Sequence, residues 1–187
     1  PIDVEPDPRV TGVHTGENGH NPIDFVRAQT PAGDALAIYS SAEALSAHRP
    51  GDRPMALDFR TIGLTALIET GGRVVVNPGT DAVLLPRPAV AALAQGDQWL
   101  PAWRDVALRE LLLAEASAAC SAITDLSITY AGDGLTRVIV SVERSCFTGA
   151  ANASAMKQSL TQALSHVGAN RRLIASADRV EIAPILA

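Results

Sequence analysis

The segment Asn77-Pro78-Gly79-Thr80-Asp81 concentrates residue types that can bind a ligand. Proline and glycine leave backbone amides exposed, and the side chains of Asn, Thr and Asp are polar. The same residues also build a tight turn, because Asn hydrogen-bonds to nearby backbone, Pro fixes φ and Gly adopts a positive φ. Apolar runs on both sides favour the turn, so we expect strands at 73–77 and 82–85 and a positive φ at Gly79. Asn77, Pro78 and Gly79 remain candidates for a binding loop.

Two tryptophans form the second candidate site. Trp99 and Trp103 are four residues apart, a spacing that places both on one face of a helix. With Leu100 they are the main large apolar residues outside the periodic apolar stripes. The simplest interpretation is that they seal the joint between two halves of the chain. The sharper alternative is an aromatic anchor at a protein interface.

Residues that could catalyse a reaction are present but are not arranged for it. Nucleophilic catalysis needs a Ser or Cys held near a His and an orienting acid, yet no G-x-S-x-G frame or Cys–His context occurs. His14 and His20 lack a third fixed ligand for a metal, and the glycine pairs lack the strand-to-helix context of a phosphate loop. We therefore expect no catalytic residues, no metal and no cofactor, and hence a protein that is not an enzyme.

Composition and charge exclude further classes of protein. The net charge is −5, with twelve acidic and seven basic residues before position 102, so nucleic-acid binding is not expected. No apolar run reaches the length of a membrane span, and residues 1–9 do not form a signal peptide. Two cysteines, Cys120 and Cys146, do not make a disulfide framework. We expect buried, reduced thiols in a cytoplasmic protein, and the use of Ala, Gly, Pro and Arg suggests a GC-rich bacterial genome.

The N-terminal half reads as alternating strands and helices after a proline-rich, flexible arm at 1–22. Ser40-Ser-Ala-Glu43 matches a capping box, in which Glu43 reaches back to the N–H of the cap residue. A helix at 61–70 carries Leu64, Leu67 and Ile68 on one stripe, the pattern of a face turned toward a core. The other expected elements are strands at 23–26, 35–39 and 55–59, a helix after 40–43 and a helix at 88–94.

The C-terminal half reads as helix, strand, strand, helix, strand. The Gly132-Asp133-Gly134 sequence predicts a hairpin turn, and Arg171-Arg172 is interpreted as a solvated loop, with an acidic partner as the alternative. The expected elements are a helix at 108–119, strands at 122–130 and 135–142, a helix at 154–167 and a strand at 179–185. The fold class is therefore α+β, with two small mixed βα subdomains at 23–98 and 99–187.

Three segments of the first half resemble the N-terminal domain of the SseB family, the enhanced-serine-sensitivity proteins of bacteria. They are 35–45, 61–68 and Val74-Val-Val-Asn-Pro-Gly-Thr80, the last leading to 84–86 and Val90. The second half is similar to the companion C-terminal domain by pattern only. The resemblance implies a cytoplasmic protein of α/β or α+β fold without a catalytic site. Tyr39 stands where the family often has Phe, so its hydroxyl needs a partner or solvent.

These observations favour a non-catalytic accessory protein of the SseB type that acts through protein contacts in stress tolerance, secretion or assembly. A protein partner or a second copy would cover Trp99 and Trp103, or a sheet edge near Asn77-Pro78. The alternative is a sensor of a small molecule or peptide, with a pocket between the two halves.

Overall fold

The computed structural model describes residues 25–148 and 150–187, and the chain divides into two compact units, Pro1–Asp97 and Gln98–Ala187. The sequence places the boundary between residues 98 and 99. The arm expected at 1–22, with His14 and His20, lies outside the described residues. The architecture is α+β, with helices and two small sheets.

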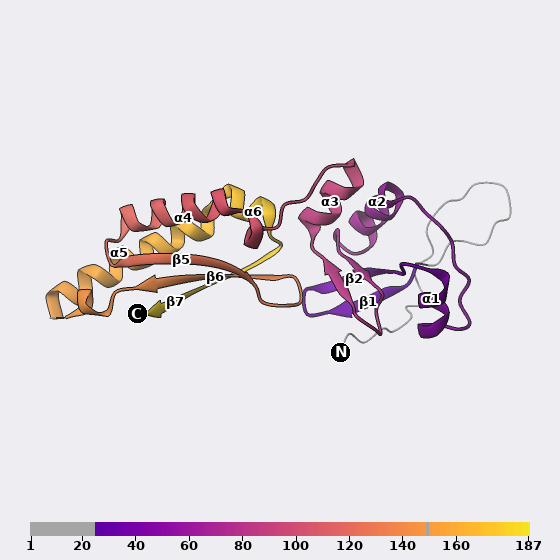
Figure 1. Ribbon diagram of the computed structural model, residues 1–187, viewed down its shortest axis with the longest axis horizontal. Coiled ribbons are helices and arrows are strands. Elements are labelled where there is room, and N and C mark those ends of the chain that lie inside the picture. Colours follow the sequence, from indigo (N-terminus) through magenta and orange to yellow (C-terminus); the bar gives the residue numbers. More distant parts are fainter. Residues whose placement is uncertain (1–24, 149) are drawn as a thin grey trace. The chain divides into compact units, whose positions relative to one another are not determined.

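The N-terminal unit is built on a four-stranded sheet in the order β1-β2-β3-β4. β2 and β3 are parallel, and the other two pairs are antiparallel. Helices α2 and α3 pack together and lie along one side of this sheet in Figure 1. The elements are β1 (Arg27–Thr30), β2 (Gly33–Ile38), α1 (Ala42–His48), α2 (Phe59–Glu69), β3 (Val74–Val76), β4 (Val83–Leu85) and α3 (Arg87–Gln95).

Alternation along the strands gives this sheet two buried faces. The face toward α2 and α3 contributes one cluster of buried apolar side chains, and the opposite face contributes another made largely of small residues. The first cluster is Leu36, Ala66, Val74 and Val90, and the second is Ala28, Ala35, Val75 and Leu84.

Two strand predictions in this unit were wrong. Half of the strand expected at 23–26 lies outside the described residues, and Phe25 and Val26 belong to no strand. Among the described residues the first strand is β1, where Arg27 and Gln29 alternate with buried Ala28 before the turn that begins at Pro31. Residues 55–58 form no strand. Asp58 instead caps α2, and its carboxylate accepts hydrogen bonds from the backbone N–H and the hydroxyl of Thr61 at 3.0 and 2.8 Å. The cap starts a helix where the apolar pattern suggested a strand.

The start of α1 differs in detail from the expected capping box. Ser41 is the cap residue, and its hydroxyl oxygen accepts from the N–H of Ala44 at 3.2 Å. Glu43 does not reach back to the cap residue's N–H. Hydrogen bonds from its own backbone N–H and from the Ser41 hydroxyl lower the pKa of Glu43. The cap is therefore present, but its reciprocal bond is replaced by a more local one.

The apolar stripe of α2 faces away from the core. Leu64, Leu67 and Ile68 are 52, 50 and 82 % exposed, whereas Gly63 and Ala66 are buried. A side chain at Gly63 would meet the Cβ of Ala94 in α3 at 2.6 Å. Close contact between α2 and α3 therefore selects the small residues for the interface and leaves the large ones outside.

The C-terminal unit carries a three-stranded sheet in the order β5-β6-β7. β5 and β6 form an antiparallel hairpin, and β7 runs parallel to β6. Helices α4 and α5 pack against each other on the same side of this sheet (Figure 1). The elements are η1 (Ala102–Arg104), α4 (Val106–Ala119), β5 (Ile123–Tyr130), β6 (Leu135–Val142), η2 (Arg144–Phe147), α5 (Ala150–Ala169), α6 (Arg171–Ser176) and β7 (Arg179–Leu186).

A single apolar cluster joins the helices and the sheet of this unit. Its fully buried side chains include Leu108 and Leu112 of α4, Val138 and Val140 of β6 and Val167 of α5. The opposite face of the sheet is partly polar, and Arg137 of β6 pairs with Glu181 of β7 at 2.9 Å. The sheet is thus covered by helices on one face.

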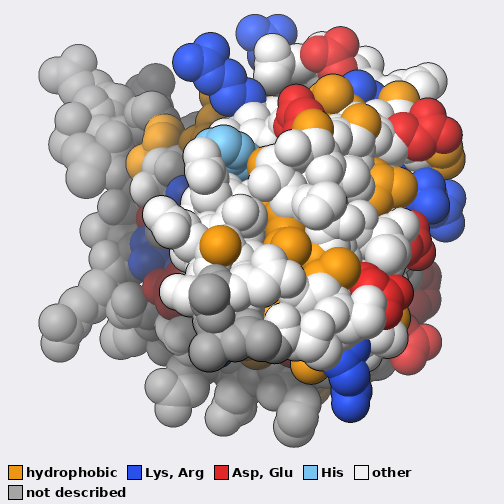
Figure 2. Space-filling model, turned by 90° about the vertical axis from the view of Figure 1, so that its left-hand side faces the viewer, with side chains coloured by type: hydrophobic (Ala, Val, Ile, Leu, Met, Phe, Trp, Pro, Cys, Tyr) orange, Lys and Arg blue, Asp and Glu red, His pale blue; other side chains and the backbone are white. Residues whose placement is uncertain are grey.

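Among the described residues, no helix has the length and hydropathy needed to cross a membrane. On the face drawn in Figure 2, the coloured hydrophobic side chains are dispersed among polar ones, and acidic and basic side chains are both present. The described part of this face therefore shows a mixed surface.

Candidate functional site

The Asn77 side chain ties the end of β3 to the start of α1. Its Oδ1 accepts a hydrogen bond from the Ser40 N–H at 2.8 Å, and its Nδ2 donates to the Ser40 hydroxyl at 3.0 Å. Asn77 also has a φ of 51°, a left-handed conformation that Asn tolerates better than most residues. These bonds occupy the amide in joining two segments, so this side chain serves the turn.

Pro78 and Gly79 have structural roles in the same turn. Pro78 is buried, and Gly79 has the positive φ predicted from the sequence, at 92°. A Cβ at Gly79 would lie 2.4 Å from Cδ2 of His48, so the imidazole packs directly on the glycine backbone. Asn77-Pro78 follows β3, an interior strand, whereas the neighbouring β4 is an edge of the sheet and its exposed Val83 pairs with Val76 beside this turn.

A small polar network surrounds His48 at the end of α1. The Tyr39 hydroxyl lies 2.9 Å from Nδ1 of His48, which supplies the partner that this hydroxyl needs. Burial raises the pKa of Tyr39, Arg49 opposes that shift and Asp52 adds to it. Arg49 and Asp52 form an ion pair of their own. The network can orient the imidazole, and it lies beside the carboxyl ends of the parallel strands β2 and β3, where α/β proteins often bind ligands.

The two tryptophans lie together, but not on a shared α-helical face as expected. Trp99 precedes η1 and Trp103 lies within it, and their rings meet edge to face with centroids 5.7 Å apart. Trp99 donates from Nε1 to the Ser176 carbonyl at 3.3 Å, and the Trp103 ring lies against the Tyr130 ring at a tilt of 40°, with centroids 4.9 Å apart. Both tryptophans are half-buried, and the neighbouring Leu100 is 52 % exposed. The cluster therefore keeps part of its apolar surface accessible within the C-terminal unit.

Sequence reasoning missed the α2 stripe as a candidate binding surface. The stripe consists of Leu64, Leu67 and Ile68. All three side chains are at least half exposed on one face of α2. The signal that identifies it is the pair of small residues Gly63 and Ala66, which have the i, i+3 spacing of a close helix contact. Small residues in one stripe and large ones in the next indicate that the small stripe faces the neighbouring helix.

The described residues contain no group of three His, Cys, Asp or Glu side chains that could hold a metal. Cys120 and Cys146 are both free thiols. Cys120 is buried, with its sulfur 3.7 Å from that of Met156, but Cys146 is half-buried, because it lies in the short helix η2 at the border of the core. The prediction of two buried thiols was therefore wrong for Cys146.

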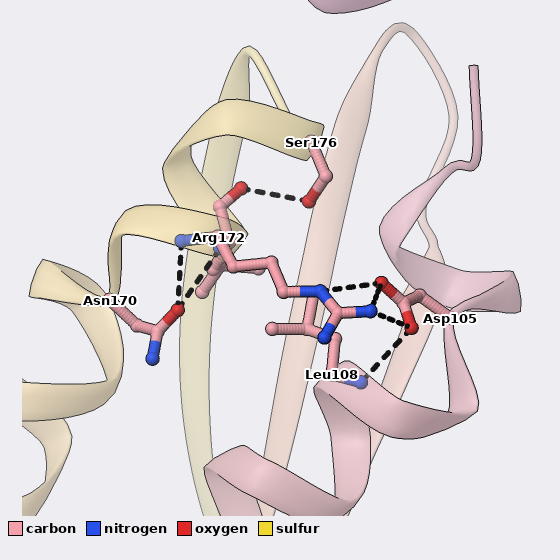
Figure 3. Close-up of polar contacts among 6 residues, drawn as sticks. Asp105, Leu108, Asn170, Arg172 and Ser176 are labelled. Carbon is pink, nitrogen blue, oxygen red and sulfur yellow. Dashed lines mark hydrogen bonds and ion pairs between the residues drawn. The ribbon is translucent and has the colours of Figure 1, made fainter. Parts of the chain in front are cut away.

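Arg172 does not lie in a solvated loop. Residues 171–176 form the helix α6, and the Arg172 guanidinium donates to both oxygens of Asp105 at 2.8 and 3.0 Å (Figure 3). Oδ1 of Asp105 also accepts from the Leu108 N–H at 3.0 Å and so caps α4. The loop prediction failed because Asn170 caps α6 by accepting from the N–H groups of Arg172 and Leu173.

Comparison with known proteins gives one family. Residues 2–92 match the family model described as the SseB protein N-terminal domain. Searches of curated proteins and of solved structures gave no significant match. The match spans the strand–helix start at Ser40-Ser41, α2 and the Asn77-Pro78-Gly79 turn, the segments on which the resemblance rests. The match assigns the N-terminal half of the chain, residues 2–92, to the SseB protein N-terminal domain.

Proposed function

We propose that this protein is a non-catalytic accessory protein of the SseB type, which binds another protein or a second copy of itself. The proposed setting is the cytoplasm of a bacterium, in stress tolerance, secretion or assembly, as the family resemblance implies. The observation that supports association is the exposed α2 stripe of Leu64, Leu67 and Ile68. It lies in the domain that the family model matches.

Leaving the apolar side chains of this stripe in water costs free energy, which a partner would recover by covering them. Burial of apolar surface contributes roughly 25 cal/mol per Å². Three large aliphatic side chains that are at least half exposed on one helix face can therefore contribute several contacts to a partner without unfolding α2. Arg60 and Thr61, which are exposed on the same helix, supply a polar rim of the kind that borders protein interfaces.

Three polar side chains that could support catalysis have structural tasks instead. The Asn77 amide is occupied by Ser40, the Asp58 carboxylate caps α2 and the Asp105 carboxylate caps α4. The Tyr39–His48 pair, near the carboxyl ends of the parallel strands, is the exception, because no described hydrogen bond makes either side chain a helix cap. Because the other three side chains serve the fold, binding is favoured over chemistry.

The test compares the proteins that three baits capture from the native host. The wild-type chain, Ile68→Glu and the matched control Ile174→Glu are compared, because Ile174 is also a helical isoleucine and is 55 % exposed. A partner that is retained by the wild type and the control but lost by Ile68→Glu supports the proposal. Retention of the same partner by all three baits, or turnover of a metabolite by the purified chain alone, contradicts it.

A further inference from the structure

The outer edge of β7 has the features of a strand that invites pairing with another chain. β7 is eight residues long, and among the described residues only those of β6 pair with it. Val180, Ile185 and Leu186 are exposed along it. Unpaired backbone groups beside exposed apolar side chains are a template for strand addition.

The hydrogen bonds at the end of β7 identify the backbone groups that point outward. The Ala187 N–H donates to the Val142 carbonyl at 2.9 Å, and the Ala187 carbonyl accepts from the Arg144 N–H at 3.3 Å. Both groups of Ala187 therefore face β6. Because neighbouring residues of a strand direct these groups to opposite sides, the outward positions are those of even number: Val180, Ile182, Pro184 and Leu186.

We infer that Pro184 blocks the pairing of β7 with a second copy of this chain. Proline has no N–H, and Pro184 stands at an outward position with Ile182 on one side and Leu186 on the other. In a two-fold antiparallel pair centred on Ala183, Pro184 of each copy lies opposite Ile182 of the other. The two Ile182 carbonyls then lose their donors inside the new sheet, and an unsatisfied buried carbonyl opposes association.

The side chains on this edge would otherwise favour the pair. The same two-fold register places exposed Val180 of one copy opposite exposed Leu186 of the other. No pair of like charges is brought face to face by this register, since Glu181 lies opposite Ile185. The missing N–H of Pro184 is thus the feature of β7 that opposes self-pairing.

The experiment restores the N–H and measures the mass of the full chain in solution. Pro184→Ala adds the donor with little apolar surface, Pro184→Val adds a strand-forming side chain, and Pro54→Ala is the control at an exposed proline outside the sheets. Sedimentation at increasing concentration should show a doubling of mass for both Pro184 variants. It should show no change between Pro54→Ala and the wild type. Amide exchange at Val180 and Ile182 should slow only in the associated variants.

A double variant tests whether the missing N–H, and not some other effect of replacing Pro184, prevents pairing. Val180→Pro combined with Pro184→Val moves the gap to another outward position of the same edge, and this double variant should stay at the wild-type mass. The inference is overturned if folded Pro184→Ala and Pro184→Val keep the wild-type mass at every concentration. It is also overturned if the wild-type amides of Val180 and Ile182 already become protected as the concentration rises.

Discussion

The Asp105 carboxylate holds the Arg172 guanidinium through two hydrogen bonds while its Oδ1 also caps α4. One buried side chain thereby fixes the start of α4 and the position of α6, which are far apart in the sequence. The Asp105 side chain is 8 % exposed and the Arg172 side chain 49 %. The carboxylate therefore relies on its protein partners for hydrogen bonds, whereas water also reaches the guanidinium.

We predict that Asp105→Ala destabilises the chain more than Arg172→Ala. The first change removes the cap as well as the ion pair, and loss of a cap alone costs about 1 kcal/mol. The second leaves Asp105 bonded to the Leu108 N–H, and the exposed guanidinium contributes less because solvent screens it. Urea unfolding of both variants checks the order, with Arg172→Lys as the control that keeps the charge. Equal losses would show that the cap contributes nothing.

Gly79 should tolerate no side chain, for two separable reasons. Gly79→Ala places a Cβ against His48 and forces a residue with a side chain into a positive φ, at a combined cost of about 1–3 kcal/mol. His48→Ala in the same chain should recover the part that comes from the contact and leave the part that comes from φ. Thermal unfolding of the two single variants and the double variant measures this coupling. Strict additivity would exclude the His48 contact.

The two roles of Asn77 can also be separated. Asn77→Gly keeps the left-handed backbone accessible but loses the bonds to Ser40, whereas Asn77→Ala loses both. We expect Asn77→Ala to be the less stable of the two, by about 1 kcal/mol, because alanine is strained at positive φ. Chemical unfolding of both variants provides the measurement. A more stable Asn77→Ala would contradict a left-handed residue at this position.

The cap of α2 should depend on pH. Hydrogen bonds from the Thr61 N–H, then from its hydroxyl, lower the pKa of Asp58 in the folded chain. A lowered folded pKa means that the stabilisation is present above the unfolded pKa, about 4, and is lost as the pH falls through the folded value. Asp58→Asn caps the helix without a charge, so at neutral pH its Tm should be lower than that of the wild type. The difference should shrink in acid, and a constant difference would refute the assignment.

The two thiols should react at different rates. Cys120 is buried beside Met156, and Cys146 is half-buried in η2. Under native conditions a thiol reagent should label Cys146 first and reach Cys120 only after the C-terminal unit opens. Mass spectrometry of digested, labelled protein reads both sites. Faster labelling of Cys120 would contradict its position in the core.

Patterns local in the sequence predicted most of the elements. The return strand of the C-terminal hairpin occupies the expected residues 135–142, because alternation and the Asp-Gly turn specify strand and register together. The strand at 55–59 and the loop at 171–172 failed for one shared reason. In each place a capping side chain, Asp58 or Asn170, starts a helix where apolar or basic residues dominate the pattern.

The candidate sites were harder to predict because their roles depend on contacts between distant residues. Asn77 has the composition of a binding loop, and only its bonds to Ser40, 37 residues away, reveal a structural task. The α2 stripe faces away from the core because α3 packs against the opposite side of α2, where Gly63 lies next to Ala94. Periodicity finds an apolar stripe but does not state whether the core or a partner covers it.

The most direct test of association through α2 is photo-crosslinking in the native host. A photoreactive phenylalanine replaces Ile68 in one variant and Ile174, another exposed helical isoleucine, in the other. The proposed function predicts a crosslinked product, to a partner protein or to a second copy of the chain, from position 68 and not from position 174. No product from position 68, or the same products from both positions, would contradict it.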